Sequence, residues 1–314
     1  MVLFRPGFPS PASCSTAVEV DSHHHLWVPD PGRFPWLAKP GLTRLNRSFG
    51  LADLAAAAAG TGIGATVVVQ AADDITETEE LLAQADKGSA HFPRAPTVAG
   101  VVGWLDLADH GAPGTLARLL AWPGGQRLAG VRANLRGAPF PGWLTGPAPV
   151  AALRRLAAEG LALDVLAGPR ELPAVTAVTA ANPGLRVILN HAGHPPLGAP
   201  SGEFAAWAAS MRVLAGHPNV AVKFSGLVTR GAGIRWPAED LRPVAEILLT
   251  AFSDDRVLFG SDWPVCLLSA CYADVAATAR EALSGASPAR VFGGNARRWY
   301  RLADASARGD IRLS

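Results

Sequence analysis

The sequence lacks the cysteines that a disulfide framework requires. Its 314 residues include only Cys14, Cys266 and Cys271, and so small and odd a number of thiols is typical of proteins that fold in a reducing compartment. Basic runs are also missing, because the net charge of +2 is spread along the chain without aromatic residues interleaved among basic ones. Such a chain has no electrostatic footprint for nucleic acid. We therefore expect a cytoplasmic protein with no nucleic-acid partner.

Long apolar runs are absent as well. No stretch of 18 or more residues is free of polar interruptions, including the region around the alanine-rich segment Leu51 to Ala59, so we expect neither a membrane span nor a membrane partner. Residues 1–17 contain three prolines and no continuous apolar core, which is not the pattern of a signal peptide. They are predicted to form a flexible N-terminal extension, and residues 303–314 are predicted to form a C-terminal tail.

What the sequence does contain is a repeating alternation of two kinds of segment. Hydrophobic residues make up 49% of the chain and charged residues only 17%, the balance of a protein with a well-buried core. Short β-branched runs alternate with longer segments rich in alanine and leucine, which is the pattern of βα units in a parallel sheet. The eight predicted strands are Val18 to Asp21, Ala65 to Gln70, Val98 to Leu105, Gly130 to Asn134, Leu161 to Leu166, Arg186 to Asn190, Val220 to Phe224 and Arg256 to Gly260.

Several segments between these strands have recognisable helix ends. Gly60 and Gly160 lie where a glycine commonly follows a helix, and Ser287-Pro288 has the order of an N-cap followed by a first-turn proline. The predicted helices include Leu51 to Ala59, Thr78 to Ala85, Pro149 to Glu159, Glu203 to Ala215, Glu239 to Phe252 and Tyr272 to Leu283. We predict an α/β fold, a (β/α)8 TIM barrel that forms a single domain over residues 18–302, with an extra C-terminal helix through Tyr300 closing its bottom.

The first predicted strand leads into three consecutive histidines. Catalysis in such barrels uses the C-terminal ends of the strands, and side chains two apart on a strand share a face. His23 and His25 should therefore point together into the barrel mouth, while His24 points toward the helices. Two imidazoles at this spacing suit a divalent metal, although a chance cluster of histidines would give the same pattern.

Two other strand ends carry candidate groups. Asp262 follows the last strand directly, and closure of the barrel would set it beside His23 and His25; alone, it would also suit a helix cap or a turn. His191 stands at the exit of strand six, where a single histidine is commonly structural. Three strand ends with metal-ligand or acid-base residues in one barrel favour an active site over coincidence.

Taken together, these residues resemble the amidohydrolase superfamily, and within it the branch that contains L-fuconolactonase and 2-pyrone-4,6-dicarboxylate lactonase. The resemblance runs from about Glu19 to Leu302. It rests on the ordered motifs VDSHHHLW, FPWL, VVVQAADDITETEELL, VVGWLDL, GVRANLRG, LDVLAGPRELP, VILNHAGHP, VAVKFSGLVT, VLFGSDWPVCLL and VFGGNARRWY. It implies a distorted barrel in which His23, His25 and Asp262 lie at a metal position, Asp262 is the general base and His191 lies near the scissile carbonyl.

The same resemblance limits the metal content of the site. Strand four has no lysine to become the carboxylated ligand of binuclear members, since it reads Gly130-Val131-Arg132-Ala133-Asn134, and strand five offers no histidine. At most one divalent metal, zinc or manganese, is therefore expected. Members similar to the 2-pyrone-4,6-dicarboxylate lactonases are thought to use none, so both alternatives stay open.

The expected activity is hydrolysis of a cyclic ester, either an aldonolactone or a lactone of specialised metabolism. Asp262 would activate water with or without one metal, and His191 or Arg132 would polarise the carbonyl. Asn190 and His194 stand where sugar-lactonase relatives commonly have aspartate and lysine, which leaves the substrate open. A metal-dependent decarboxylase or another C–N or C–C hydrolase of the superfamily is one alternative, and a non-catalytic binding barrel is another.

Polar and aromatic residues at other strand ends are candidates for contacts with a small-molecule substrate. A polar group within or after a strand costs free energy unless it is paired or functional, and aromatic faces suit sugar rings. The candidates are Arg132, Gln70, Lys223, Trp27, Trp36, Trp104, Asp106 and His194. The alternatives are a structural ion pair for Arg132 and Lys223 and plain packing for the tryptophans. Barrels of this type often form dimers, so a homodimer is a further hypothesis.

Overall fold

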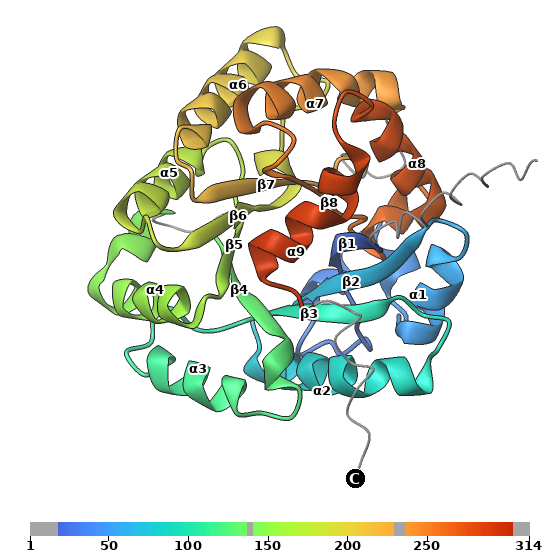
Figure 1. Cartoon of the computed structure of the whole chain (residues 1–314), viewed down its shortest axis with the longest axis vertical. Coiled ribbons are helices and arrows are strands. Elements are labelled where there is room, and N and C mark those ends of the chain that lie inside the picture. The colour runs from blue at the N-terminus through green and yellow to red at the C-terminus, as the bar shows by residue number, and fades with distance from the viewer. Residues whose placement is uncertain (1–17, 137–140, 229–236, 304–314) are drawn as a thin grey trace, which may run out of the picture.

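The computed structural model describes residues 18–136, 141–228 and 237–303, and it contains one sheet of eight parallel strands (Figure 1). The strands pair in sequence order, from β1 to β8. They are β1 (Glu19–His24), β2 (Ile63–Val69), β3 (Thr97–Gly103), β4 (Leu128–Asn134), β5 (Ala162–Leu166), β6 (Arg186–Leu189), β7 (Val220–Phe224) and β8 (Val257–Phe259). The predicted (β/α)8 barrel and its eight strands are confirmed.

Helices surround the sheet in a ring (Figure 1). The ring is formed by α1 (Leu51–Ala58), α2 (Ile75–His91), α3 (Ala112–Leu120), α4 (Pro147–Glu159), α5 (Leu172–Ala181), α6 (Ser201–Ala215), α7 (Ala238–Phe252) and α8 (Tyr272–Ala282), and α9 (Asn295–Tyr300) follows them in the chain. Short 3-10 turns occupy several loops, among them Pro35–Ala38, Pro141–Thr145 and Asn190–Gly193. No helix in the described ranges is long and apolar enough to cross a membrane.

The barrel closes just beyond the end of β8. The backbone N–H of Asp262 donates to the carbonyl of His23 at 2.8 Å, and the N–H of His25 donates to the carbonyl of Trp263 at 2.7 Å. Below these bonds, the buried carboxylate of Asp21 accepts hydrogen bonds from the backbone N–H and the hydroxyl of Ser261, 240 residues away. The backbone hydrogen bonds that close the barrel therefore involve the predicted site residues themselves.

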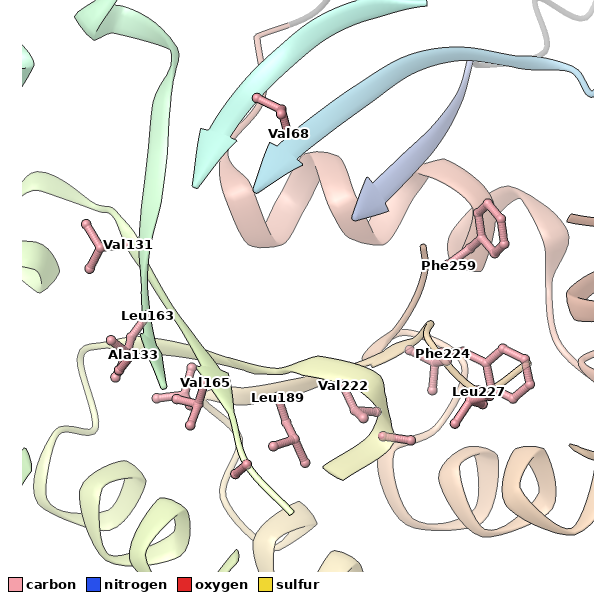
Figure 2. Packing of buried hydrophobic residues seen from close by; sticks show 14 of the residues in the cluster. Val68, Val131, Ala133, Leu163, Val165, Leu189, Val222, Phe224, Leu227 and Phe259 are labelled. Atoms are coloured by element: carbon pink, nitrogen blue, oxygen red, sulfur yellow. The ribbon is translucent and has the colours of Figure 1, made fainter. Parts of the chain in front are cut away.

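Alternation along the strands divides the buried residues into an inner and an outer set. On β5, Leu163 and Val165 face the helices, where Figure 2 shows them in the outer core, while Ala162 belongs to the inner set. The same alternation on β7 places Val222 outside and Ala221 inside. Since side chains two apart share a face of a strand, two charged residues, Asp164 and Lys223, point into the barrel.

The last helix, α9, lies inside the ring of helices, across one end of the barrel (Figure 1). Ala296, Trp299 and Tyr300 pack against the inner set, which includes Val67 and Val102. An apolar inner set of this kind would be open to water without a cover, and the aromatic residues of α9 provide one. The predicted extra helix at the barrel bottom is confirmed.

Two predictions concern residues outside the described ranges. The flexible extension proposed for residues 1–17 lies outside them, and so does nearly all of the tail proposed for residues 303–314, of which only Ala303 is described. The domain boundaries therefore stay predictions.

Candidate active site

The histidines at the end of β1 point where their spacing predicts. His23 and His25 approach each other with 3.3 Å between their Nε2 atoms, whereas His24 turns away and its Nε2 lies 3.0 Å from the hydroxyl of Thr66. His25 Nδ1 lies 2.7 Å from the carbonyl oxygen of Val69. Because a carbonyl only accepts hydrogen bonds, Nδ1 carries the proton and the lone pair of Nε2 faces the site.

Asp262 lies beside the two histidines, in the segment after β8 that closes the barrel against β1. Its Oδ1 lies 3.6 Å from His23 Nε2 and 3.5 Å from His25 Nε2. Its backbone adopts a left-handed conformation with φ of 58°, which is costly for a residue other than glycine and is commonly retained at functional sites. The hydrogen bond from its N–H to the carbonyl of His23 helps to hold it there.

These three side chains fit a single divalent metal. They form the one cluster of at least three such ligands found among the described residues, and their donor atoms lie within 4.8 Å of one another. Ligands at about 2.0 to 2.1 Å from a tetrahedral zinc are separated from each other by about 3.3 Å. The separations of 3.3, 3.5 and 3.6 Å are close to that value. His23, His25 and Asp262 can therefore hold a divalent metal without a large rearrangement.

A fully buried ion pair supports His23 from below. Lys223 Nζ lies 2.6 Å from a carboxylate oxygen of Asp164 and 3.1 Å from His23 Nδ1. Tyr300 of α9 donates its hydroxyl to the same carboxylate at 2.8 Å. When the Lys223 ammonium donates to Nδ1, the neutral ring carries its proton on Nε2, and a metal at Nε2 must displace that proton.

His191 completes the group from the 3-10 turn after β6. Its Nε2 lies 3.9 Å from Asp262 Oδ1, and its Nδ1 lies 2.9 Å from the hydroxyl of Ser225. His191, Ala192 and His194 all have φ near +50°, in the left-handed region. Such a run of strained residues persists only where the surroundings fix it.

Burial makes the central histidines weak bases. It lowers the pKa of both His23 and His191 well below the ordinary value, and nearby positive groups, Lys223 for His23 and His194 for His191, lower it further. Both imidazoles are therefore neutral at neutral pH. Neutral rings are the form that binds metals and donates a hydrogen bond without adding charge.

The site opens into a cavity of about 820 Å³, here called the main cavity. His25, His191 and Asp262 line it together with Trp27 and Trp36, whose rings meet edge to face at 5.3 Å. Three basic side chains on the wall of the main cavity could also contact a substrate: Arg132, Arg136 and His194.

Four predicted substrate contacts lie elsewhere. Gln70 is buried, and its side-chain oxygen accepts from Nη2 of Arg132 at 3.1 Å. Lys223 is fully buried in its ion pair and does not line the main cavity, which is the structural alternative stated for it. Trp104 and Asp106 line a smaller neighbouring cavity instead.

Three contributors to the site were not predicted. Ser225 and Gly226 directly follow β7, and a methyl group on Gly226 would lie 2.5 Å from His191 Nδ1. The sequence signal for both is their position at a strand end, since serine and glycine there lack the reactive side chains that mark His23, His191 and Asp262. Asp164 lies inside a strand, and nothing in the sequence links it to His23.

The loop after β2 forms part of the cavity wall and is held by a buried carboxylate. Glu77 accepts hydrogen bonds from the backbone N–H groups of Ala71 and Ala72, at 2.8 to 3.0 Å. Burial raises the pKa of Glu77 to about 7, although these bonds and the nearby Arg132 act to lower it. Glu77 therefore ties the wall of the cavity to the first turn of α2.

Comparison with known proteins gives consistent matches over most of the chain. The sequence model of a family described as Amidohydrolase matches residues 20–302. The chain is 35% identical to an L-fucono-1,5-lactonase of Burkholderia ambifaria in an alignment of 293 positions that covers 90% of this chain and 95% of that protein. It is 36% identical to the L-fucono-1,5-lactonase of Burkholderia multivorans, over 91% of this chain and 97% of the relative. A crystal structure of an amidohydrolase from Burkholderia multivorans with bound zinc matches with a TM-score of 0.80 at 35% identity, over 91% of this chain and 100% of that one.

Proposed function

This chain belongs to the amidohydrolase family, and from that premise we propose that it opens the ring of a sugar-type lactone by hydrolysis. The observation that carries the proposal is the position of Asp262 Oδ1. It lies 3.5 to 3.9 Å from Nε2 of three histidines, and Asp262 itself lines a cavity large enough for a small substrate. The two relatives named as L-fucono-1,5-lactonases support an aldonolactone over other cyclic esters.

In the proposed reaction, Asp262 acts as the general base. It accepts a proton from water as the water oxygen bonds to the carbonyl carbon of the lactone. The bond between that carbon and the ring oxygen then breaks, and Asp262 returns the proton to the leaving alkoxide. The product is a hydroxy acid, which releases one proton to the medium at neutral pH.

His191 and Arg132 stabilise the negative charge that develops on the carbonyl oxygen. A Ser225 hydroxyl that donates to Nδ1 leaves the proton of the neutral His191 ring on Nε2. Arg132 lines the main cavity, and its hydrogen bonds to the protein come from Nη2, to the two oxygens of Gln70. Its Nε is buried, so Nη1 is the group left to meet the substrate, where fixed donors lower the barrier most.

His23, His25 and Asp262 would hold one divalent metal, zinc or manganese. When bound there, such an ion would lower the pKa of water from its high ordinary value toward about 7. The protein's own groups do the rest: Asp262 moves the proton, His25 is oriented by Val69, and Lys223 fixes His23. With no metal, the same carboxylate would activate water alone and the two histidines would hydrogen-bond to the substrate.

The test is a screen of aldonolactones for acid release with the wild-type protein and with Asp262→Asn, with metal content measured on both. We expect the asparagine variant to lose a factor of about 100 or more in kcat, because it cannot accept the proton. Equal turnover by the two proteins would remove Asp262 from the mechanism. Release of carbon dioxide from aromatic carboxylates, with no acid release from any lactone, would establish the decarboxylase alternative instead.

A further inference from the structure

A second, smaller cavity adjoins the main one on the same rim of the barrel. It has a volume of about 250 Å³, is here called the side cavity, and lies among residues that follow β2 and β3 and residues within and after the end of β4. Asp73, Arg132 and Asn134 line both cavities, so the two are neighbours that meet at these side chains. A substrate bound beside Asp262 can therefore extend past Arg132 into the side cavity.

The walls of the side cavity combine indole faces with uncommitted polar atoms. Trp104 and Trp143 line it and are half-buried. Asp106 is exposed, and Oδ1 accepts from the backbone N–H of Ala108 at 3.0 Å, which leaves Oδ2 without a hydrogen bond among the described residues. Exposed Asp73 has neither an ion pair nor a side-chain hydrogen bond in the described parts of the chain.

The charges on these walls disfavour an anion and partly cancel one another. Two carboxylates, Asp73 and Asp106, repel an anion, while the guanidinium of Arg132 between the cavities offsets part of their attraction for a cation. Asn134 adds an amide whose oxygen accepts from the backbone N–H of Arg136 at 3.0 Å, so that its NH₂ group is left to donate. A neutral group with many hydroxyls matches these walls, because each hydroxyl can both donate to a carboxylate and accept from an amide.

We propose that the side cavity is a subsite for a second hydroxylated ring, and that the substrates of this enzyme include aldonolactones that carry a glycosyl substituent. The C–H face of the second ring would pack on Trp104 or Trp143 while its hydroxyls bond to Asp73, Asp106 and Asn134. The glycosidic bond stays intact, and the ester step is unchanged. This inference rests on the proposed lactonase function for the chemistry, although the binding of the second ring can be measured without turnover.

Gluconate and lactobionate separate the two questions, because lactobionate is gluconate with a galactosyl group attached. Isothermal titration calorimetry on the wild-type protein should show lactobionate binding at least about 10-fold more tightly than gluconate, from one or two added hydrogen bonds to charged groups. Equal affinities would overturn the subsite.

Asp106→Asn is the sharpest variant, because asparagine retains the Oδ1 that accepts from Ala108 and replaces only the uncommitted oxygen. It should weaken lactobionate about 5- to 10-fold and leave gluconate unchanged. Asp109→Asn is the matched control: Asp109 is also exposed and accepts from a backbone N–H two residues on, that of Gly111, but it lines neither cavity. An equal effect of Asp106→Asn on both ligands, or of both variants on lactobionate, would contradict the inference.

Turnover distinguishes failure of the subsite from failure of the proposed function. We expect lactobiono-1,5-lactone to be hydrolysed with a lower KM than glucono-1,5-lactone, and Trp143→Phe to raise KM for the former while kcat stays the same. Hydrolysis of both lactones with equal KM would overturn the subsite and leave the lactonase. Tight, Asp106-dependent binding of lactobionate without hydrolysis of either lactone would support the subsite and count against lactonase activity on this ring.

Discussion

At the scale of single residues, the active site depends on a position that carries no side chain. Gly226 has φ of +60°, and a methyl group there would lie 2.5 Å from His191 Nδ1 and 3.1 Å from Asp262 Oδ2. We expect Gly226→Ala to push both groups from their places and to lower kcat at least about 10-fold, since small displacements of catalytic groups are costly. Assays of lactone hydrolysis beside thermal unfolding would show this. Gly285→Ala is the control, because nothing lies within 4 Å of its added methyl group, and wild-type kcat in both variants would contradict the prediction.

The histidine motif allows a second residue-scale prediction, about metal. His25 offers Nε2 to the site while His24 beside it bonds to Thr66. His25→Ala should therefore lower zinc affinity about 100-fold or more, because it removes one ligand outright and a lost outer partner alone typically costs 10- to 100-fold. His24→Gln should keep wild-type affinity. Competition with a zinc-binding dye measures both, and retention of zinc by His25→Ala would show that these donors do not form the metal site.

At the scale of helices and strands, local sequence patterns predicted most of the barrel. The strands stand out because both faces are buried and their sequences are continuously apolar or β-branched. Helices α3 and α5 are not among the helices predicted above, because their local sequences are poor helix formers. The first turn of α3 contains Pro113 and Gly114, and α5 contains two valines and two threonines, residues of low helix propensity. Burial in the outer core, which includes Leu116 and Leu119 of α3 and Val175 and Val178 of α5, outweighs these local preferences.

The same limit applies to the site. The sequence predicts that four side chains lie close together, because each adjoins a strand end and the strand ends of a barrel lie on one rim. They are His23, His25, His191 and Asp262. The residues that support these four side chains could not be predicted from the sequence. Asp164 on β5 meets Lys223 on β7 across the inside of the barrel, with β6 between the two strands, and no local pattern specifies that contact.

Glu77, which ties α2 to the wall of the main cavity, makes the stability of the protein depend on pH. Its pKa is about 7 in the folded protein, against an ordinary value of 4.5. A carboxyl group with a raised folded pKa contributes stability that is fully present below pH 4.5 and is lost as the pH rises through 7. The advantage of wild type over Glu77→Gln should shrink across this window by up to about 3 kcal/mol. Urea unfolding at pH 5 and pH 8 measures it. Arg33 and Arg132 are the charged groups that act on this carboxylate, and a pH-independent difference would exclude the linkage.

At the scale of the whole molecule, the barrel is organised around a buried polar column. Tyr300 on α9, Asp164 on β5, Lys223 on β7 and His23 on β1 form one chain of contacts from the bottom of the barrel to the active site. Each contact joins residues that are far apart in sequence. The helix that covers the inner core is therefore coupled to the catalytic rim through fully buried charges.

This column should behave as a unit. Lys223→Met leaves the Asp164 carboxylate buried without its counter-ion, which typically costs about 3 to 5 kcal/mol. Replacing both groups, as Lys223→Met with Asp164→Leu, removes the uncompensated charge and should recover about half of that loss or more, although Tyr300 then lacks an acceptor. The exposed pair Arg155 and Glu159, 2.6 Å apart on α4, is the control, since Arg155→Met should change stability by less than about 0.5 kcal/mol. The coupling energy comes directly from urea unfolding of wild type, the single variants Lys223→Met and Asp164→Leu, and the double variant. Arg155→Met is measured in the same way. A double variant as unstable as the sum of its single variants would mean that Lys223 and Asp164 act independently, and that the column does not transmit stability from α9 to His23.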